Sequence, residues 1–209
     1  MEGVKTKHLI VGDDFRFGCD RKGDFKMLEA MGREQGFSVQ DTQTVQVQSQ
    51  RVSSTLVREL LQCSDFKSVA DLLGRSFTIS GKVTYGQQLG RKLGFPTANI
   101  ALETLQQPAF GVYAVEAYID DGQAAPQRRA GGVANIGVRP TFEKKDVLCE
   151  VHLFDSDCDL YGQRLLVRLK AFLRPEQRFS GIDALLAQIA TDAEQARRIL
   201  SDLHLRQSG

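Results

Sequence analysis

Residues 81–99 read Gly-Lys-Val-Thr-Tyr-Gly-Gln-Gln-Leu-Gly-Arg-Lys-Leu-Gly-Phe-Pro-Thr-Ala-Asn. Glycine permits backbone conformations in which several N–H groups point into one concavity and bind phosphate oxygens. Two cations stand between the last two glycines of the stretch. The pattern therefore predicts an anion-binding loop, and its candidate ATP and phosphate contacts are Gly81, Gly86, Gly90, Arg91, Lys92 and Gly94.

Thr97 and Asn99 follow this loop and are two residues apart. In extended backbone their side chains project to one face, where a hydroxyl and an amide oxygen can hold a hard cation such as Mg²⁺. The spacing predicts a metal-nucleotide site. The stretch is neither a P-loop nor a Gly-x-Gly-x-x-Gly motif, and a flexible hairpin connection with a surface turn explains the same residues. Both interpretations stay open.

Apolar and polar residues alternate along residues 77–85, which predicts a half-buried strand that leads into the loop. Further strands are predicted downstream at residues 111–119, 133–136, 147–154 and 165–173. Short strands with turn signals and no helices between them are typical of a closed antiparallel sheet. We therefore predict an antiparallel β-barrel. An amphipathic helix, residues 182–203, is expected to plug or flank it.

The preceding residues, 1–74, follow another pattern. A short apolar strand at residues 8–11, a helix that begins after Asp24 and a strand near residues 37–39 predict a strand–helix–strand unit of a parallel sheet. Two short helices, 59–63 and 66–73, come next. Because no phosphate loop follows the first strand, this segment resembles only part of a nucleotide-binding domain. The predicted class is α+β, with a partial α/β domain at 1–74 and the barrel at 75–209.

Ser53, Ser54 and Thr55 precede the helix predicted at residues 59–63, and Arg58 directly precedes it. Hydroxyl groups at a helix start accept hydrogen bonds from its free N–H groups, and the same N–H groups can bind phosphate. Helix capping is the simpler interpretation, and phosphate binding is the functional one.

The composition excludes several classes of function. With 27 basic and 26 acidic residues, the net charge of +1 gives no signature for binding nucleic acid or an anionic membrane. The four cysteines lack a Cys-x-x-Cys spacing, which indicates reduced thiols and no structural zinc. The sequence contains no run of about 18 consecutive apolar residues, so no membrane-spanning helix is predicted. We expect a cytoplasmic protein, monomeric or weakly self-associating, that binds small molecules.

Glu150 lies on a strand face with Leu148, His152 and Phe154. A half-buried carboxylate suits a base that takes a proton from an alcohol, whereas a solvated or ion-paired acid is the structural alternative. His152 is expected to have a structural role. Asn135 either binds a ligand or makes a turn, and the Arg174–Arg178 loop either meets a phosphate or caps the barrel rim.

Four motifs occur in order: Gly-Phe-Pro-Thr-Ala-Asn at 94–99, Phe-Gly-Val-Tyr at 110–113, Asn-Ile-Gly-Val-Arg-Pro-Thr-Phe at 135–142 and Glu-Val-His at 150–152. Together they resemble the bacterial bifunctional riboflavin kinase/FMN adenylyltransferase family, also called FAD synthetase, over nearly the whole chain. The resemblance implies a riboflavin kinase-like Greek-key β-barrel of the six-stranded type at residues 75–209. It also implies that residues 1–74 are the C-terminal part of an FMN adenylyltransferase-like, nucleotidyltransferase-type domain.

The resemblance further implies an ATP- and Mg²⁺-dependent phosphoryl transfer to riboflavin that makes FMN. In this hypothesis Thr97 and Asn99 contact Mg²⁺ and ATP, Glu150 is the base, and the flavin contacts are Asn135, Arg174 and Arg178. The adenylyltransferase remnant comprises Asp13, Asp14, Phe15, Phe17, Ser53, Ser54, Thr55 and Arg58. The family's His-x-Gly-His signature is absent from the chain, so adenylyl transfer is not expected of this chain alone. The alternatives are a non-catalytic flavin- or nucleotide-binding module and, against the charge balance, a nucleic-acid-binding barrel.

Overall fold

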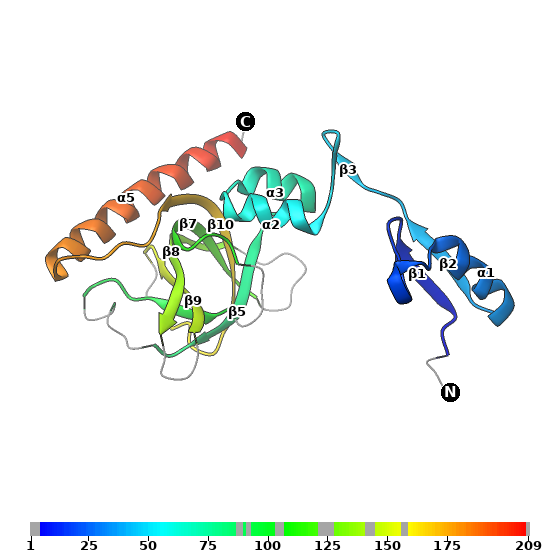
Figure 1. Cartoon of the computed structure of the whole chain (residues 1–209). Coiled ribbons are helices and arrows are strands. Elements are labelled where there is room, and N and C mark those ends of the chain that lie inside the picture. Colours follow the sequence, from blue (N-terminus) through cyan, green and yellow to red (C-terminus); the bar gives the residue numbers. More distant parts are fainter. Residues whose placement is uncertain are drawn as a thin grey trace. The chain divides into compact units, whose positions relative to one another are not determined.

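The computed structural model describes residues 5–86, 90, 93–102, 107–120, 128–140, 145–155 and 159–207. The chain divides into two compact units, Met1–Ser53 and Ser54–Gly209 (Figure 1). The predicted phosphate contacts Arg91 and Lys92 lie outside the described residues.

The first unit is built around a parallel pair of strands, β1 (His8–Gly12) and β2 (Ser38–Thr42). They are connected through the short 3₁₀ helix η1 (Cys19–Arg21) and the helix α1 (Phe25–Gln35). The Asp24 side chain caps α1 by accepting from the Met27 N–H at 2.9 Å, and Gly36, with φ 75°, ends the helix. A small hairpin, β3 (Gln46–Val47) and β4 (Gln50–Arg51), follows. The predicted strand–helix–strand unit is present.

Six strands of the second unit close into an antiparallel barrel in the order β10-β5-β6-β9-β8-β7 (Figure 1). They are β5 (Thr78–Thr84), β6 (Ala98–Ala101), β7 (Gly111–Ile119), β8 (Arg128–Pro140), β9 (Lys145–Leu153) and β10 (Arg164–Arg174). β7, β8 and β9 are successive neighbours, and β10 returns to pair with β7. This is a Greek-key connection, so the predicted fold class is confirmed.

Two barrel strands differ from the sequence-based expectation. β6 was not predicted as a strand; it has four residues, and its pairing with β5 and β9 defines it. β8 runs from Arg128 to Pro140, far beyond the predicted 133–136, because it pairs along nearly its whole length with β7 and β9. In both cases partners distant in the sequence determine the strand.

The helices α2 (Ser54–Gln62) and α3 (Phe66–Leu73) belong with the barrel. Leu61, Phe66 and Val69 are buried in the same hydrophobic cluster as the inward-facing barrel residues. The sequence placed the start of the first helix at residue 59 and the domain boundary at residue 74, whereas the compact units divide after Ser53. The physical reason is that the apolar faces of both helices are buried against the barrel.

This packing predicts the outcome of truncation. We expect residues 54–209 to unfold cooperatively, whereas residues 75–209 should melt at a much lower temperature or aggregate. Full burial of one large apolar side chain contributes about 1.5–3 kcal/mol, and the shorter fragment loses Leu61, Phe66 and Val69 together. Thermal denaturation followed by circular dichroism measures the difference. Similar melting temperatures for the two fragments would contradict the assignment of α2 and α3 to the barrel.

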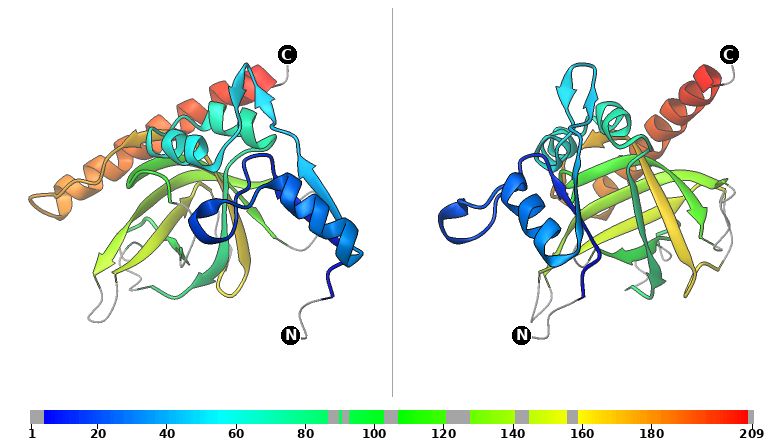
Figure 2. Two further views of the ribbon diagram at one scale, coloured as in Figure 1. Left: turned by 45° about the vertical axis from the view of Figure 1, so that its right-hand side comes forward. Right: turned by 90° about the vertical axis from the view of Figure 1, so that its right-hand side faces the viewer.

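The C-terminal helix α5 (Ile182–Gln207) lies alongside the barrel and contacts β7, β8 and β10 (Figure 2). Ala196 and Leu200 of α5 pack against Ala114 of β7 and Phe154 in a second buried cluster. Of the two arrangements predicted from the sequence, plugging or flanking the barrel, the helix adopts the second. Within the described part of the chain, no helix combines the length and the apolar character needed to cross a bilayer.

Candidate active site

A cavity of about 490 Å³ lies between the barrel wall, the end of the glycine-rich loop and the N-terminal half of α5. Its lining combines polar and apolar side chains in similar numbers, and its volume is typical of sites for small molecules. Predicted site residues that line it are Gly90, Thr97, Asn99, Asn135, Glu150 and Arg174.

Three of the polar side chains are aligned across three neighbouring strands. Asn99 of β6 is directly opposite Glu150 of β9, and Glu150 is directly opposite Asn135 of β8. Cβ atoms of directly opposite residues in an antiparallel pair are about 4.5–5.5 Å apart and on the same face. The barrel thus brings together an amide, a carboxylate and a second amide that are far apart in the sequence. We call these three residues the polar row.

Asn99 carries the most unusual polar atom of the cavity. Its side chain is buried, with 6% of the residue exposed, and its Oδ1 atom has no hydrogen-bond partner within the described part of the chain. A buried acceptor without a partner costs about 1–3 kcal/mol. The atom is therefore available to a ligand that supplies a donor or a cation.

The residues present fit a hard cation held together with a nucleotide. Among the described residues there is no cluster of three His, Cys, Asp or Glu side chains that could bind a metal by themselves. Mg²⁺ commonly takes only one or two protein oxygens and completes its shell with water and substrate phosphates. The Asn99 amide oxygen, together with the Thr97 hydroxyl two residues before it, offers such a partial set.

The glycine-rich loop approaches these oxygens closely where the structure describes it. A Cβ atom added to Gly86 would lie 2.5 Å from Asn99 Nδ2, and one added to Gly90 would lie 2.4 Å from the Phe95 carbonyl oxygen. Gly94 has φ +84°, a conformation that favours glycine. Gly81 is different: it lies within β5, where a Cβ atom would collide with the Ile100 side chain at 2.4 Å. Gly81 packs in the barrel wall and is not among the lining residues of the cavity, and its predicted phosphate contact stays a prediction.

The close approach at Gly86 leads to a prediction. We expect Gly86→Ala to displace the Asn99 amide and to lower nucleotide affinity and turnover together, since a shift of about 1 Å in a positioned group can cost on the order of 10²-fold. Gly181→Ala is the matched control, because a Cβ atom there would meet nothing within 4 Å. Nucleotide titrations of both variants measure the effect. Wild-type behaviour of Gly86→Ala would show that Asn99 does not need its observed position.

His152 lines the cavity and is also bonded within the protein, so its structural role stays a prediction. Its Nδ1 atom donates to the Pro96 carbonyl oxygen at 2.9 Å, and its ring meets the Phe95 ring edge-on at a centroid distance of 5.5 Å. Since the carbonyl can only accept, Nδ1 carries the proton. The histidine thereby holds the Phe95-Pro96 segment that leads to Thr97.

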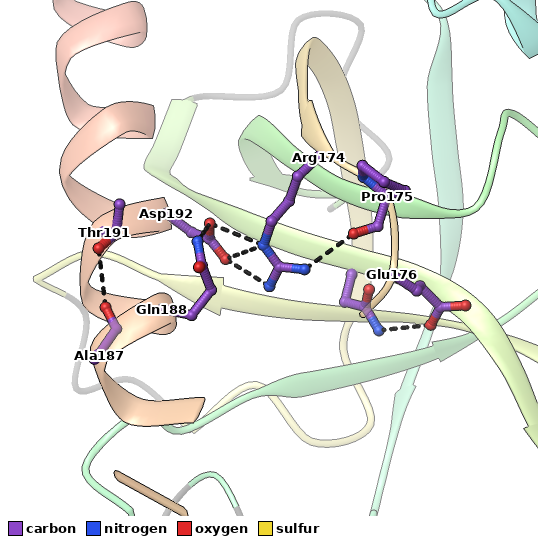
Figure 3. Close-up of polar contacts among 8 residues, drawn as sticks. Arg174, Pro175, Glu176, Ala187, Gln188, Thr191 and Asp192 are labelled. Carbon is purple, nitrogen blue, oxygen red and sulfur yellow. Dashed lines mark hydrogen bonds and ion pairs between the residues drawn. The ribbon is translucent and has the colours of Figure 1, made fainter. Parts of the chain in front are cut away.

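The three predicted flavin contacts differ in their position relative to the cavity. Asn135 lies in the polar row, and its Nδ2 atom donates to Glu176 Oε1 at 3.4 Å. Arg174 lines the cavity, but its guanidinium is engaged by Asp192 of α5 (Figure 3). Arg178 is exposed and is not among the lining residues of the cavity. Direct flavin contacts of all three residues stay predictions.

The family profile described as riboflavin kinase matches residues 73–200, which form the barrel and most of α5. The chain belongs to the riboflavin kinase family. A second profile, described as FAD synthetase, matches residues 1–56. The resemblance drawn from the four sequence motifs is therefore confirmed.

Relatives of known identity agree with this assignment. A bifunctional riboflavin kinase/FMN adenylyltransferase from Pseudomonas fluorescens is 49% identical over 201 residues, which cover 95% of this chain and 62% of the relative. The protein of the same description from Escherichia coli (strain K12) is 46% identical over 197 residues, or 94% of this chain and 61% of the relative. The chain thus spans about three-fifths of the length of the curated relatives it matches.

A solved structure is similar to this chain over most of its length. The crystal structure described as a macrolide-efflux protein from Streptococcus pneumoniae superposes with a TM-score of 0.69 at 30% sequence identity. The match covers 90% of this chain and 60% of that protein. The likeness concerns the fold.

The sequence did not reveal that α5 forms the side of the cavity that faces the polar row. Leu185, Ile189 and Ala193 of α5 line the cavity together with Asp192. The 3.6-residue period showed that the three apolar side chains face inward, but it could not show that a cavity separates them from the strands. Asp192 gave no signal, because an acid in a helix is usually solvated.

The carboxylates assigned to the adenylyltransferase remnant are paired within the first unit. Asp13 accepts hydrogen bonds from the Thr44 hydroxyl and, at 3.0 Å, from Arg51, and Arg51 also lies 3.2 Å from Asp14. The Thr44 hydrogen bond, followed by the charge of Arg51, holds the pKa of Asp13 below its ordinary value.

The other remnant residues lie in both units. The Phe15 and Phe17 rings stack at a centroid distance of 5.8 Å in the first unit. Ser53 is the last residue of that unit, and Ser54, Thr55 and Arg58 lie on α2 in the second. A joint adenylyltransferase site made by these residues stays a prediction.

Proposed function

We propose that this chain is a riboflavin kinase, which transfers the γ-phosphate of ATP to the 5′-hydroxyl of riboflavin and makes FMN. The observation that carries the proposal is the polar row of Asn99, Glu150 and Asn135 inside one cavity, in a chain of the riboflavin kinase family. A carboxylate between two amides can receive an alcohol and orient it.

Glu150 is the proposed general base. Its half-buried carboxylate accepts the proton of the riboflavin 5′-hydroxyl as the oxygen attacks the γ-phosphorus, and the leaving group is ADP. Phosphoryl transfer depends mainly on positioning and on charge stabilisation, so one base with aligned donors is sufficient. Asn135, as the neighbour of Glu150 in register, is suited to orient the ribityl chain.

Thr97 and Asn99 are the residues that would hold Mg²⁺ together with the phosphates of ATP. When bound, the ion neutralises the charge of the transferring phosphoryl group. Backbone N–H groups of the glycine-rich loop are proposed to bind the phosphates. The Oδ1 atom of Asn99, which has no hydrogen-bond partner among the described residues, supports this assignment.

The apolar side chains of α5 suit the flat ring system of a flavin. Leu185 and Ile189 face the cavity from the helix, and Val112 and Val133 line it from the barrel. Apolar walls with a few polar groups at one end are typical of sites for a ring with a polar tail. The proposed orientation places the isoalloxazine ring against α5 and the ribityl 5′-end at Glu150.

We also propose that this chain by itself does not adenylylate FMN. Residues 1–56 match the FAD synthetase profile, and no His-x-Gly-His sequence occurs within the chain. We propose that the segment related to the FAD synthetase family extends to residue 74, although α2 and α3 pack with the barrel. We further propose a cytoplasmic location, no nucleic-acid or membrane partner, and a monomeric or weakly self-associating state.

The test is to incubate the purified chain with riboflavin, ATP and Mg²⁺ and to separate the flavins by chromatography. We expect FMN and an equal amount of ADP. Flavin binding without phosphorylation would replace the proposal by the non-catalytic flavin-binding module. FAD among the products would contradict the loss of adenylyl transfer.

A further inference from the structure

Two ion pairs of very different burial attach α5 to the rest of its unit. Arg174 at the end of β10 pairs with Asp192, and their side chains are only 17% and 5% exposed. Arg197 pairs with Asp155 after β9, and these side chains are 50% and 78% exposed. The first pair lines the cavity, whereas neither member of the second pair does.

Arg174 and Asp192 belong to a hydrogen-bond network that restricts the orientation of both side chains (Figure 3). Arg174 Nε donates to both Asp192 carboxylate oxygens, at 3.1 and 3.0 Å, and Nη2 donates to Oδ2 at 2.8 Å. Nη1 donates to the Pro175 carbonyl oxygen at 3.0 Å, and Gln188 Nε2 donates to Asp192 Oδ1 at 2.9 Å. Forked arginine–carboxylate contacts fix the orientation of both partners.

This network continues the polar row. In the strand register Asn135 is opposite Val112, and Val112 is opposite Arg174. The backbone that places Glu150 and Asn135 therefore also places Arg174. Because Arg174 binds Asp192, the strand register is also linked to the position of α5. Leu185, Ile189 and Ala193 of this helix line the cavity together with Asp192.

We propose that Asp192 is a positioning residue for the flavin: by holding Arg174, it fixes the separation between the apolar wall of α5 and the polar row. The inference rests on the proposed riboflavin kinase function and deepens it by naming what sets the fit of the flavin ring. The Nε, Nη1 and Nη2 atoms of Arg174 all donate within the protein. Arg174 thus acts through α5 and not as the principal contact of the substrate.

Loss of the pair should affect the two substrates unequally. Asn99 lies on the barrel strand β6, Thr97 directly precedes that strand, and neither residue is a partner in the Arg174–Asp192 network. Freeing α5 changes the width of the flavin side of the cavity and leaves the nucleotide side unchanged. A residue needed only for folding would not produce this split.

The test measures KM for riboflavin, KM for ATP and kcat in Asp192→Asn. We expect KM for riboflavin to rise roughly tenfold or more, with KM for ATP and kcat nearly unchanged. The matched control is Arg197→Met, which removes the exposed attachment of the same helix and should change none of the three. Arg174→Lys keeps the charge without the fork and should fall between wild type and Asp192→Asn.

A second variant is needed in case Asp192→Asn fails to fold, because one charge left alone in a buried site is strongly destabilising. Arg174→Met/Asp192→Leu replaces both charges with apolar groups and should fold. In this double variant KM for riboflavin should remain raised. Thermal denaturation of each variant confirms the folded state.

The outcomes separate this inference from the proposed function. An unchanged KM for riboflavin in folded Asp192→Asn and in the double variant would overturn the positioning role, and so would an equal loss in all three parameters. If wild type formed no FMN, the proposed function would fail. The inference would then be decided by riboflavin fluorescence quenching, in which weaker flavin binding by Asp192→Asn supports it and unchanged binding overturns it.

Discussion

Replacing Glu150 by glutamine is expected to lower kcat by about 10²–10⁴-fold, the usual contribution of a general base. The amide has nearly the shape of the carboxylate, but it cannot take the proton of the riboflavin 5′-hydroxyl. Binding of riboflavin and ATP should change little, since the substitution removes an interaction used mainly in the chemical step. Steady-state kinetics together with flavin fluorescence quenching measure the two effects separately.

The matched control is Glu176→Gln, the same substitution at another carboxylate of the cavity. Glu176 accepts from Asn135 and lies beside Gly137, where it leaves no room for a Cβ atom. Its loss should disturb Asn135 and reduce kcat far less than Glu150→Gln does. Equal effects of the two substitutions, or wild-type turnover of Glu150→Gln, would remove Glu150 from the role of base.

The second large effect is expected at Asn99. Asn99→Leu keeps the side-chain shape and removes the Oδ1 oxygen, for which the described residues offer no hydrogen-bond partner. A contact with a charged ligand is worth about 1.5–3 kcal/mol, so kcat/KM for ATP should fall by roughly ten- to a hundredfold. The ligand-free protein should melt at the same temperature as wild type or higher, because the variant no longer buries an unsatisfied acceptor.

Asn99→Asp is the control for this prediction, because it retains an oxygen ligand and adds charge. Its activity should persist with an altered dependence on Mg²⁺ concentration, which a magnesium titration of kcat/KM reveals. Unchanged nucleotide kinetics in Asn99→Leu would show that the buried oxygen serves neither the metal nor ATP. A large loss of stability in the ligand-free variant would show instead that the amide is structural.

Local sequence patterns predicted most of the fold. The strand–helix–strand unit followed from the Asp24 cap, the Gly36 stop and the apolar runs on either side. Five barrel strands were predicted, the first from its alternating polarity and the other four as short segments with turn signals. β6 was missed because Ala-Asn-Ile-Ala is too short to show a period, and only its pairing with β5 and β9 makes it a strand. The helices α2 and α3 show apolar faces in the sequence, but not which partner buries them.

The candidate site was predictable as a set of residues and not as an arrangement. Thr97, Asn99 and Glu150 were identified from local chemistry and from family motifs, whereas their alignment depends on the register of β6 against β9. The contribution of α5 could not be foreseen, because Arg174 and Asp192 are 18 residues apart in the sequence and meet only after the helix packs on the barrel.

The most direct test of the account is a crystal structure of this chain with riboflavin, ADP and Mg²⁺. We predict that the ribityl 5′-hydroxyl will hydrogen-bond to the Glu150 carboxylate, with the nucleotide phosphates on the side of Thr97 and Asn99. A flavin bound with its 5′-end away from Glu150, or a nucleotide bound outside this cavity, would contradict the central claim.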